Sequence, residues 1–114
     1  MKDRNSVLAK FQSEEQKFLS NDGDCFGIYQ LRMSDELRHL YFMGMDYLRK
    51  SEDFPRKQNY DFIYYSKFED GMNLEKIYEI FNIYRPDDFV GHSLSVSDIV
   101  VLHIDGSNTA YYVD

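Results

Sequence analysis

The sequence of 114 residues contains one cysteine, two prolines and no tryptophan. Cys25 alone cannot form an internal disulfide, so we expect a reduced thiol and a cytoplasmic protein. The histidines His39, His92 and His103 show no ligand spacing, and with a single cysteine they predict no zinc site or other metal site. A glycine-rich phosphate loop and a dinucleotide fingerprint are also missing, so no cofactor is expected.

Long apolar runs are missing as well. Nowhere do about 18 apolar residues follow one another, and the first residues lead into an amphipathic stretch. The sequence therefore predicts neither a membrane span nor a signal peptide.

Positive charge is scarce, and it becomes scarcer along the chain. The sequence has 13 basic and 20 acidic residues, for a net charge of −7. Residues 1–20 carry four basic and three acidic side chains, residues 21–70 carry seven and ten, and residues 71–114 carry two and seven. Such a surface repels phosphate, which argues against direct nucleic-acid binding, and it would be attracted to a basic groove on another protein. Solubility alone would also explain the charge.

Aromatic residues are abundant, with ten tyrosines and nine phenylalanines. A chain of this length forms one domain with one modest core. We therefore expect an aromatic core with several phenol rings at its edge. Exposed tyrosines are good contact residues at protein interfaces, although a small domain could also use them to fill its core.

The clearest structural pattern lies near the end of the chain. Ile99 to Leu102 is an apolar, largely β-branched run, and residues 105–108 read Asp-Gly-Ser-Asn, which is typical of a hairpin turn. Residues 109–113 would form the returning strand. Because the first strand is apolar on both faces, we expect it to be central in a sheet and covered on both sides.

Upstream, the apolar spacing predicts further elements: a helix over residues 6–19, strands from 26 to 31 and from 60 to 66, and a helix over 74–82 capped by Asn73. Together they predict an α+β fold, in which a small antiparallel sheet of about four or five strands is covered by two or three helices and the C-terminal hairpin is central. We expect residues 1–20 to form an N-terminal amphipathic helix and residues 21–114 the domain proper, in a single globular unit.

Several segments resemble the YodL-like domain family, whose small modules are common in Gram-positive bacteria and their mobile elements. The matching segments are Ile28-Tyr29-Gln30-Leu31, Phe42-Met43 with Tyr47-Leu48, Asn59-Tyr60-Asp61 before Ile63-Tyr64, Leu74-Glu75-Lys76-Ile77-Tyr78 with Phe81-Asn82, and Gly91 to Asp98 running on to Ala110-Tyr111-Tyr112-Val113-Asp114. The resemblance covers roughly residues 26–114 and implies a fold more readily than an activity.

Residues 34–50 fit two readings. One is a continuous helical pattern that begins at Ser34, and the other is a short strand at residues 40–43 followed by a helix from Gly44. The resemblance favours the second reading.

The densest group of reactive side chains lies in the segment from Gly91 to Asp98. Cys25, His92 and Asp98 could be drawn as a thiol, an imidazole and an orienting carboxylate. The alternating serines equally fit a solvated edge, and Asp98 could cap a turn. Because the sequence lacks a nucleophile motif, we predict a non-enzymatic protein. An enzyme is the third-ranked hypothesis. His92, Ser93 and Ser95 are candidates for binding a small ligand or peptide.

The leading hypothesis is a non-catalytic acidic inhibitor from a mobile element that binds a basic surface on a larger protein. By analogy with small acidic anti-defence proteins, the partner could be an RNA-guided nuclease, which would make the chain an anti-CRISPR protein that blocks guide loading or the nucleic-acid channel. The expected partner-binding residues are Asp70, Glu75, Glu79, Asp87, Asp88 and Phe89. The alternative is a YodL-like module that binds a small ligand or peptide near Gly91-His92-Ser93.

Overall fold

The computed structural model describes residues 13–114. The strands are β1 (Cys25–Leu31), β2 (Tyr60–Lys67), β3 (Ile99–Ile104) and β4 (Ser107–Tyr112), and the helical elements are residues 13–19, η1 (Asp35–Leu40), α2 (Met45–Ser51), η2 (Lys57–Asn59) and α3 (Leu74–Ile83). Residues 13–19 are the described part of the expected N-terminal helix, whose earlier residues lie outside the described range. Within that range, no helix is both long and apolar enough to span a membrane.

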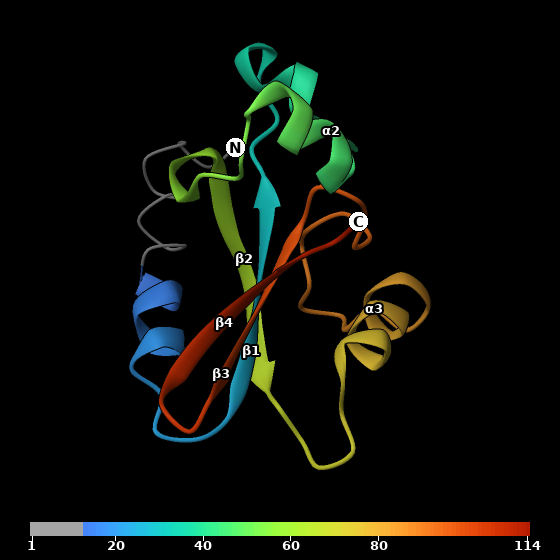
Figure 1. The fold of residues 1–114 in the computed structure, drawn as a ribbon. Coiled ribbons are helices and arrows are strands. Elements are labelled where there is room, and N and C mark those ends of the chain that lie inside the picture. The colour runs from blue at the N-terminus through green and yellow to red at the C-terminus, as the bar shows by residue number, and fades with distance from the viewer. Residues whose placement is uncertain (1–12) are drawn as a thin grey trace.

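The strands form one sheet in the order β2-β1-β3-β4, and all neighbouring strands are antiparallel. The sequence therefore predicted the α+β class and the antiparallel sheet correctly. The first hairpin strand, β3, is interior as expected, whereas the returning strand, β4, forms an edge of the sheet (Figure 1).

The two faces of the sheet carry separate layers, and residues 13–19 and α3 lie on opposite sides (Figure 1). On one face Phe18 is fully buried, and its ring lies 5.5 Å from that of Phe62. A Cβ at Gly27 would come within 2.9 Å of both rings, so only glycine lets them pack over β1 at this point. The backbone of β1 thus sits directly beneath this aromatic pair.

On the other face α3 covers the interior strands. Ile77 and Phe81 of α3 pack with Phe26 and Ile28 of β1 and with Val100 of β3. The alternation of β1 explains why it serves both layers, since its even-numbered apolar residues meet α3 and its odd-numbered ones meet Phe18 and Phe62. The Asn73 side chain accepts a hydrogen bond of 2.8 Å from the amide of Lys76, which confirms the predicted cap of α3.

For the segment after β1, the sequence favoured a short strand at residues 40–43 followed by a helix from Gly44. The structure agrees with the helix and contradicts the strand. Helix α2 begins after Gly44, as expected, but residues 40–43 do not form a strand. Phe42 has a φ of 59°, which is incompatible with an extended chain. The Tyr41 hydroxyl meanwhile donates to the carbonyl oxygen of Ser34, 2.7 Å away, and this bond folds the segment back towards the end of β1.

Candidate functional site

The exposed surface on and beside α3 is mainly acidic, although Lys76 and Arg85 are also exposed there. Glu75 and Glu79 lie one turn apart on α3 and are exposed, and Asp70, Asp87 and Asp88, in the segments before and after the helix, are also exposed. Among residues 13–114, no lysine, arginine or histidine forms an ion pair with any of these carboxylates. Their negative charge therefore faces solvent. We call these five residues the acidic surface.

Large apolar side chains accompany the acidic surface. Tyr78, between the two glutamates, is 48% exposed, and Ile83 and Tyr84 at the end of α3 are 68% and 67% exposed. Exposed aromatic and aliphatic groups beside charged ones are typical of surfaces that bind another protein.

Phe89 lies differently from the aromatic anchor that the sequence predicted. It is only partly exposed, and its ring packs at 4.9 Å from Phe81 and 5.7 Å from Tyr64. The neighbouring Asp88 accepts a hydrogen bond of 3.0 Å from the Tyr64 hydroxyl. Phe89 therefore fastens the loop after α3 to the sheet, and Asp88 is held in place by β2.

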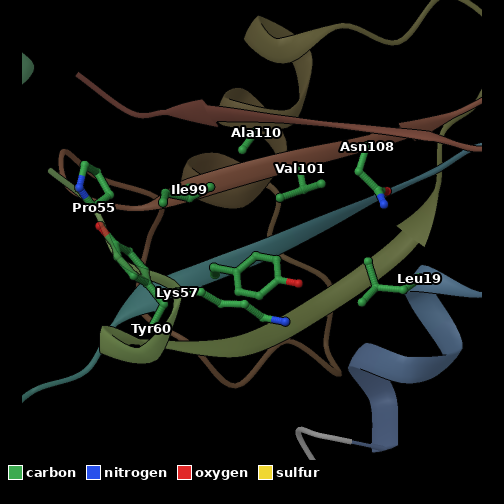
Figure 2. Close-up of a pocket in the computed structure, with 9 residues that line it drawn as sticks. Leu19, Pro55, Lys57, Tyr60, Ile99, Val101, Asn108 and Ala110 are labelled. Atoms are coloured by element: carbon green, nitrogen blue, oxygen red, sulfur yellow. The ribbon is translucent and has the colours of Figure 1, made fainter.

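Two hollows flank the β3–β4 hairpin. On the face that residues 13–19 cover, a mainly apolar cavity of about 360 Å³ extends from the hairpin across β1 towards the start of β2 (Figure 2). Its lining residues are Leu19, Tyr29, Pro55, Lys57, Tyr60, Ile99, Val101, Asn108 and Ala110. On the opposite face, a groove of about 210 Å³ lies between α3 and β4. Its lining residues are Leu74, Glu75, Tyr78, Leu94, Val100, Tyr111, Tyr112 and Val113.

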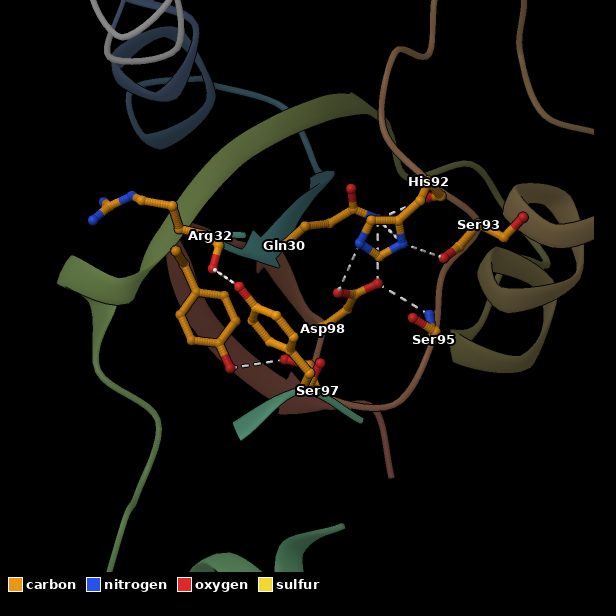
Figure 3. A network of polar contacts seen from close by, with 9 residues as sticks. Gln30, Arg32, His92, Ser93, Ser95, Ser97 and Asp98 are labelled. Carbon is orange, nitrogen blue, oxygen red and sulfur yellow. Dashed lines mark hydrogen bonds and ion pairs between the residues drawn. The ribbon is translucent and has the colours of Figure 1, made fainter. Parts of the chain in front are cut away.

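The segment from Gly91 to Asp98 forms a polar cluster around a buried carboxylate. Asp98 is fully buried, and its Oδ2 accepts hydrogen bonds from Gln30 Nε2 at 3.2 Å and from the Ser95 amide at 3.0 Å (Figure 3). The bond from the Ser95 amide is the turn cap that the sequence suggested for Asp98. Burial raises the pKa of Asp98 to about 6, although the Ser95 amide, His92 and Gln30 act in the opposite direction.

The second carboxylate oxygen of Asp98, Oδ1, has no hydrogen-bond partner among the described residues. The half-exposed imidazole of His92 faces this oxygen, and its Nε2 lies 3.9 Å away. The other ring nitrogen of His92 lies 2.8 Å from the carbonyl oxygen of Ser93. His92, Ser93 and Ser95 therefore lie around Asp98, and their role in ligand binding stays a prediction.

Reasoning from the sequence missed the role of Gln30. Its amide also donates to the carbonyl oxygen of His92 at 2.8 Å, and so it ties the loop to β1. Gly91 allows this approach, because a Cβ there would collide with Gln30 Oε1 and lie 2.8 Å from Ile63 Cγ2. The only sequence signal was a polar residue on the same strand face as Phe26 and Ile28.

Cys25 lies away from this cluster. It begins β1 opposite His103 and Lys67, whereas Gln30 lies five residues further along the same strand. The thiol donates to the carbonyl oxygen of Phe18 at 3.8 Å, and burial together with the charge of Asp24 raises its pKa. The arrangement of Cys25, His92 and Asp98 drawn from the sequence is therefore not assembled.

The three histidines also lie apart. The buried His103 ring contacts the carbonyl oxygen of Asn21 at 2.9 Å and Asn108 Oδ1 at 2.7 Å, so both its nitrogens have protein partners. His39 is exposed and lies 4.0 Å from Asp53. Over residues 13–114, no group of three or more histidine, cysteine, aspartate or glutamate side chains is arranged to hold a metal ion.

Comparison with known proteins places the chain in a family. The model of the YodL-like domain matches residues 25–114, which is most of the chain and includes the whole sheet. No curated protein and no solved structure matches the sequence. The chain belongs to the YodL-like domain family.

Proposed function

We propose that this YodL-like chain is a non-catalytic binding protein whose acidic surface occupies a basic groove on a larger protein. The observation that carries the proposal is the set of exposed carboxylates on and around α3, none of which forms an ion pair within residues 13–114. Tyr78, Ile83 and Tyr84 add apolar contact area beside them. Charge would steer the approach to a basic partner, and burial of the aromatic rings would supply affinity.

We further propose that the partner is an RNA-guided nuclease and that the chain is an anti-CRISPR protein from a mobile element. The guide channel of such a nuclease is strongly positive because it must hold a polyanion. A rigid helix with Glu75 and Glu79 one turn apart could occupy that channel before the guide does. Support for this partner comes from charge complementarity and from analogy with other small acidic inhibitors.

The test is charge reversal at Glu75→Lys and Glu79→Lys. Purified protein is added to the nuclease before or after guide loading, and binding is measured by pull-down and interference by plasmid clearance. The control is Asp22→Lys with Glu36→Lys, which makes the same change in net charge at exposed positions away from α3. We expect inhibition only when the protein is added before the guide, loss of inhibition in the α3 variant, and retention in the control.

Equal inhibition by both double variants would show that the carboxylates of α3 do not form the inhibitory site. Failure of the unmodified protein to bind or inhibit the nuclease would remove the anti-CRISPR proposal. A basic partner of another class would then be sought with the same pair of variants.

A second candidate function is the binding of a small ligand or peptide near Gly91-His92-Ser93. The specific observation is Oδ1 of Asp98, which has no hydrogen-bond partner within residues 13–114 and lies beneath a half-exposed imidazole. A ligand that displaces His92 could donate a hydrogen bond to this oxygen. A thermal-shift screen tests the idea: a hit must raise the melting temperature of the wild type and lose its effect on Asp98→Asn.

A further inference from the structure

The two edges of the sheet differ in their protection. Strand β2 pairs with β1 through a register shift that leaves Ile63 as an extra residue, and it carries the charged residues Asp61 and Lys67. Bulges and charges are the usual means by which an edge strand avoids pairing with another chain. The β2 edge is therefore protected against pairing with a strand of another chain.

The edge formed by β4 has none of these devices. Ser107–Tyr112 reads Ser-Asn-Thr-Ala-Tyr-Tyr, without a charge or a proline, and it pairs with β3 along its length without a register shift. All of its residues except Tyr112 are exposed. In the described part of the chain, no further strand lies beyond β4. Its outward N–H and C=O groups are thus available as a template for another strand.

The hollows on the two faces of the hairpin are each bounded in part by residues of β4. Asn108 and Ala110 line the cavity on one face, and Tyr111 and Val113 line the groove on the other. Successive side chains of a strand alternate between the faces of a sheet. A strand added to β4 would therefore place neighbouring residues alternately towards the cavity and the groove, as in peptide recognition by strand addition.

The charges around this edge are acidic. Asp105 precedes β4, Asp114 follows it, and Glu75 lines the groove. The cation beside the cavity, Lys57, is held at 3.1 Å from Glu15. An incoming segment would thus meet negative charge at both ends and apolar surface between them.

We propose that the edge of β4 binds an extended segment of a basic partner protein, which adds to the sheet as a fifth strand. The segment has apolar residues facing the cavity and the groove, and lysine or arginine at its flanks to meet Asp105 and Asp114. This site lies on the sheet edge and goes beyond the binding role proposed for the acidic surface.

A second copy of the chain fits this edge poorly. Antiparallel pairing of two β4 strands would bring Asp105 of one copy towards Asp114 of the other at both ends of the pair. Each copy also carries a net charge of −7. Repulsion of like charges opposes this pairing, whereas a basic segment relieves it.

The experiment is a selection from a displayed library of random nine-residue peptides, followed by affinity and hydrogen-exchange measurements on the enriched peptides. We expect enrichment of sequences with an apolar centre and basic flanks, and slower exchange at the amides of residues 107–112 on binding. Ala110→Lys should weaken binding at least tenfold, because it adds positive charge at the edge and places a long side chain at the cavity. Gln16→Lys makes the same charge change on the exposed side of the helical segment and should bind within twofold of the wild type.

Thr109→Lys is a second edge variant at an exposed position, for use if Ala110→Lys fails to fold. The Glu79→Lys and Asp87→Lys protein, which changes the acidic surface at two positions that line neither hollow, should still show slowed exchange in β4 with a saturating peptide. The β4 site and the acidic surface are thereby tested separately. The proposal is overturned by a selection without enrichment, by equal affinity for the edge variants, or by protection confined to α3. Concentration-dependent dimerisation through β4 would likewise overturn it in favour of a second copy.

Discussion

The phenol of Tyr60 in β2 donates a hydrogen bond of 2.7 Å to the carbonyl oxygen of Ser97, in the turn before β3. Both residues are buried, and β1 lies between β2 and β3 in the sheet. Ser97 has a φ of 90°, a backbone conformation that non-glycine residues rarely adopt. The bond thus holds a strained turn in place from across the interior strand.

Removal of this hydroxyl in Tyr60→Phe should lower the free energy of unfolding by about 1–2 kcal/mol, because it leaves the buried carbonyl of Ser97 without this partner. Urea unfolding followed by circular dichroism measures the change. Tyr84→Phe is the matched control, since Tyr84 is 67% exposed, and it should alter stability by less than about 0.5 kcal/mol. Equal effects of the two substitutions would show that the Tyr60 bond contributes nothing specific.

Asp98 should make stability fall as the pH rises. Its folded pKa of about 6 exceeds the ordinary value of 3.8, so the folded state holds the proton more tightly than the unfolded state does. Stability from this group is fully present below pH 3.8 and is lost as the pH rises through about 6. Asp98→Asn retains an oxygen that can accept from Gln30 and Ser95, and it removes the buried charge.

The difference in free energy of unfolding, Asp98→Asn minus wild type, should therefore increase by about 2–3 kcal/mol between pH 4 and pH 7. Above pH 7 this difference should stay level. Denaturant titrations at several pH values measure the difference, in which the titration of other groups largely cancels. A His92→Gln background separates any contribution of the imidazole that faces Asp98 Oδ1. A difference that does not change with pH would refute the prediction that burial raises the pKa of Asp98.

Gly91→Ala should destabilise the fold by about 1–3 kcal/mol, because the added methyl group meets Gln30 and Ile63 in a packed, hydrogen-bonded position. Thermal unfolding provides the measurement. Gly23→Ala is the control, since its Cβ would find an ordinary contact of 3.5 Å with Asn21 Oδ1. If the two variants have the same melting temperature, the close approach of Gly91 to Gln30 does not constrain the loop.

Cys25 should be almost inert in the folded protein. The thiol is 2% exposed and its pKa is raised, so little reactive thiolate is present at neutral pH. If alkylation requires an opening that costs about 3 kcal/mol, iodoacetamide should react roughly a hundredfold more slowly with native than with urea-unfolded protein. Mass spectrometry follows the reaction, and similar rates in the two states would contradict the burial of Cys25.

The elements that the sequence predicted best are those whose periodicity matches the local structure. The alternation in β1 assigned Phe26 and Ile28 to one face and Tyr29 and Leu31 to the other, as the two core clusters confirm. Asn73 marked the start of α3 because its side chain satisfies an amide of the first helical turn. These signals act over a few residues and need no knowledge of strand order.

The Asp98 cluster could not be derived in this way. Gln30 reaches Asp98 only because β1 pairs with β3, a long-range pairing that no local pattern specifies. Phe89 looked like an exposed anchor because its neighbours are acidic, yet contacts with Phe81 and Tyr64 cover part of its ring. The role of the acidic surface in partner binding and the division at residue 20 stay predictions.

The position of β1 also has a consequence for synthesis on the ribosome. β1 can pair with β2 early, but its other neighbour arrives late, since Val100, the partner of Ile28, lies 72 positions further along the chain. Until β3 emerges, one side of the most buried strand has no partner, and the apolar residues meant for both layers are exposed to other nascent chains. The growing polypeptide is thus most prone to aggregation before β3 emerges, when a chaperone would protect it most.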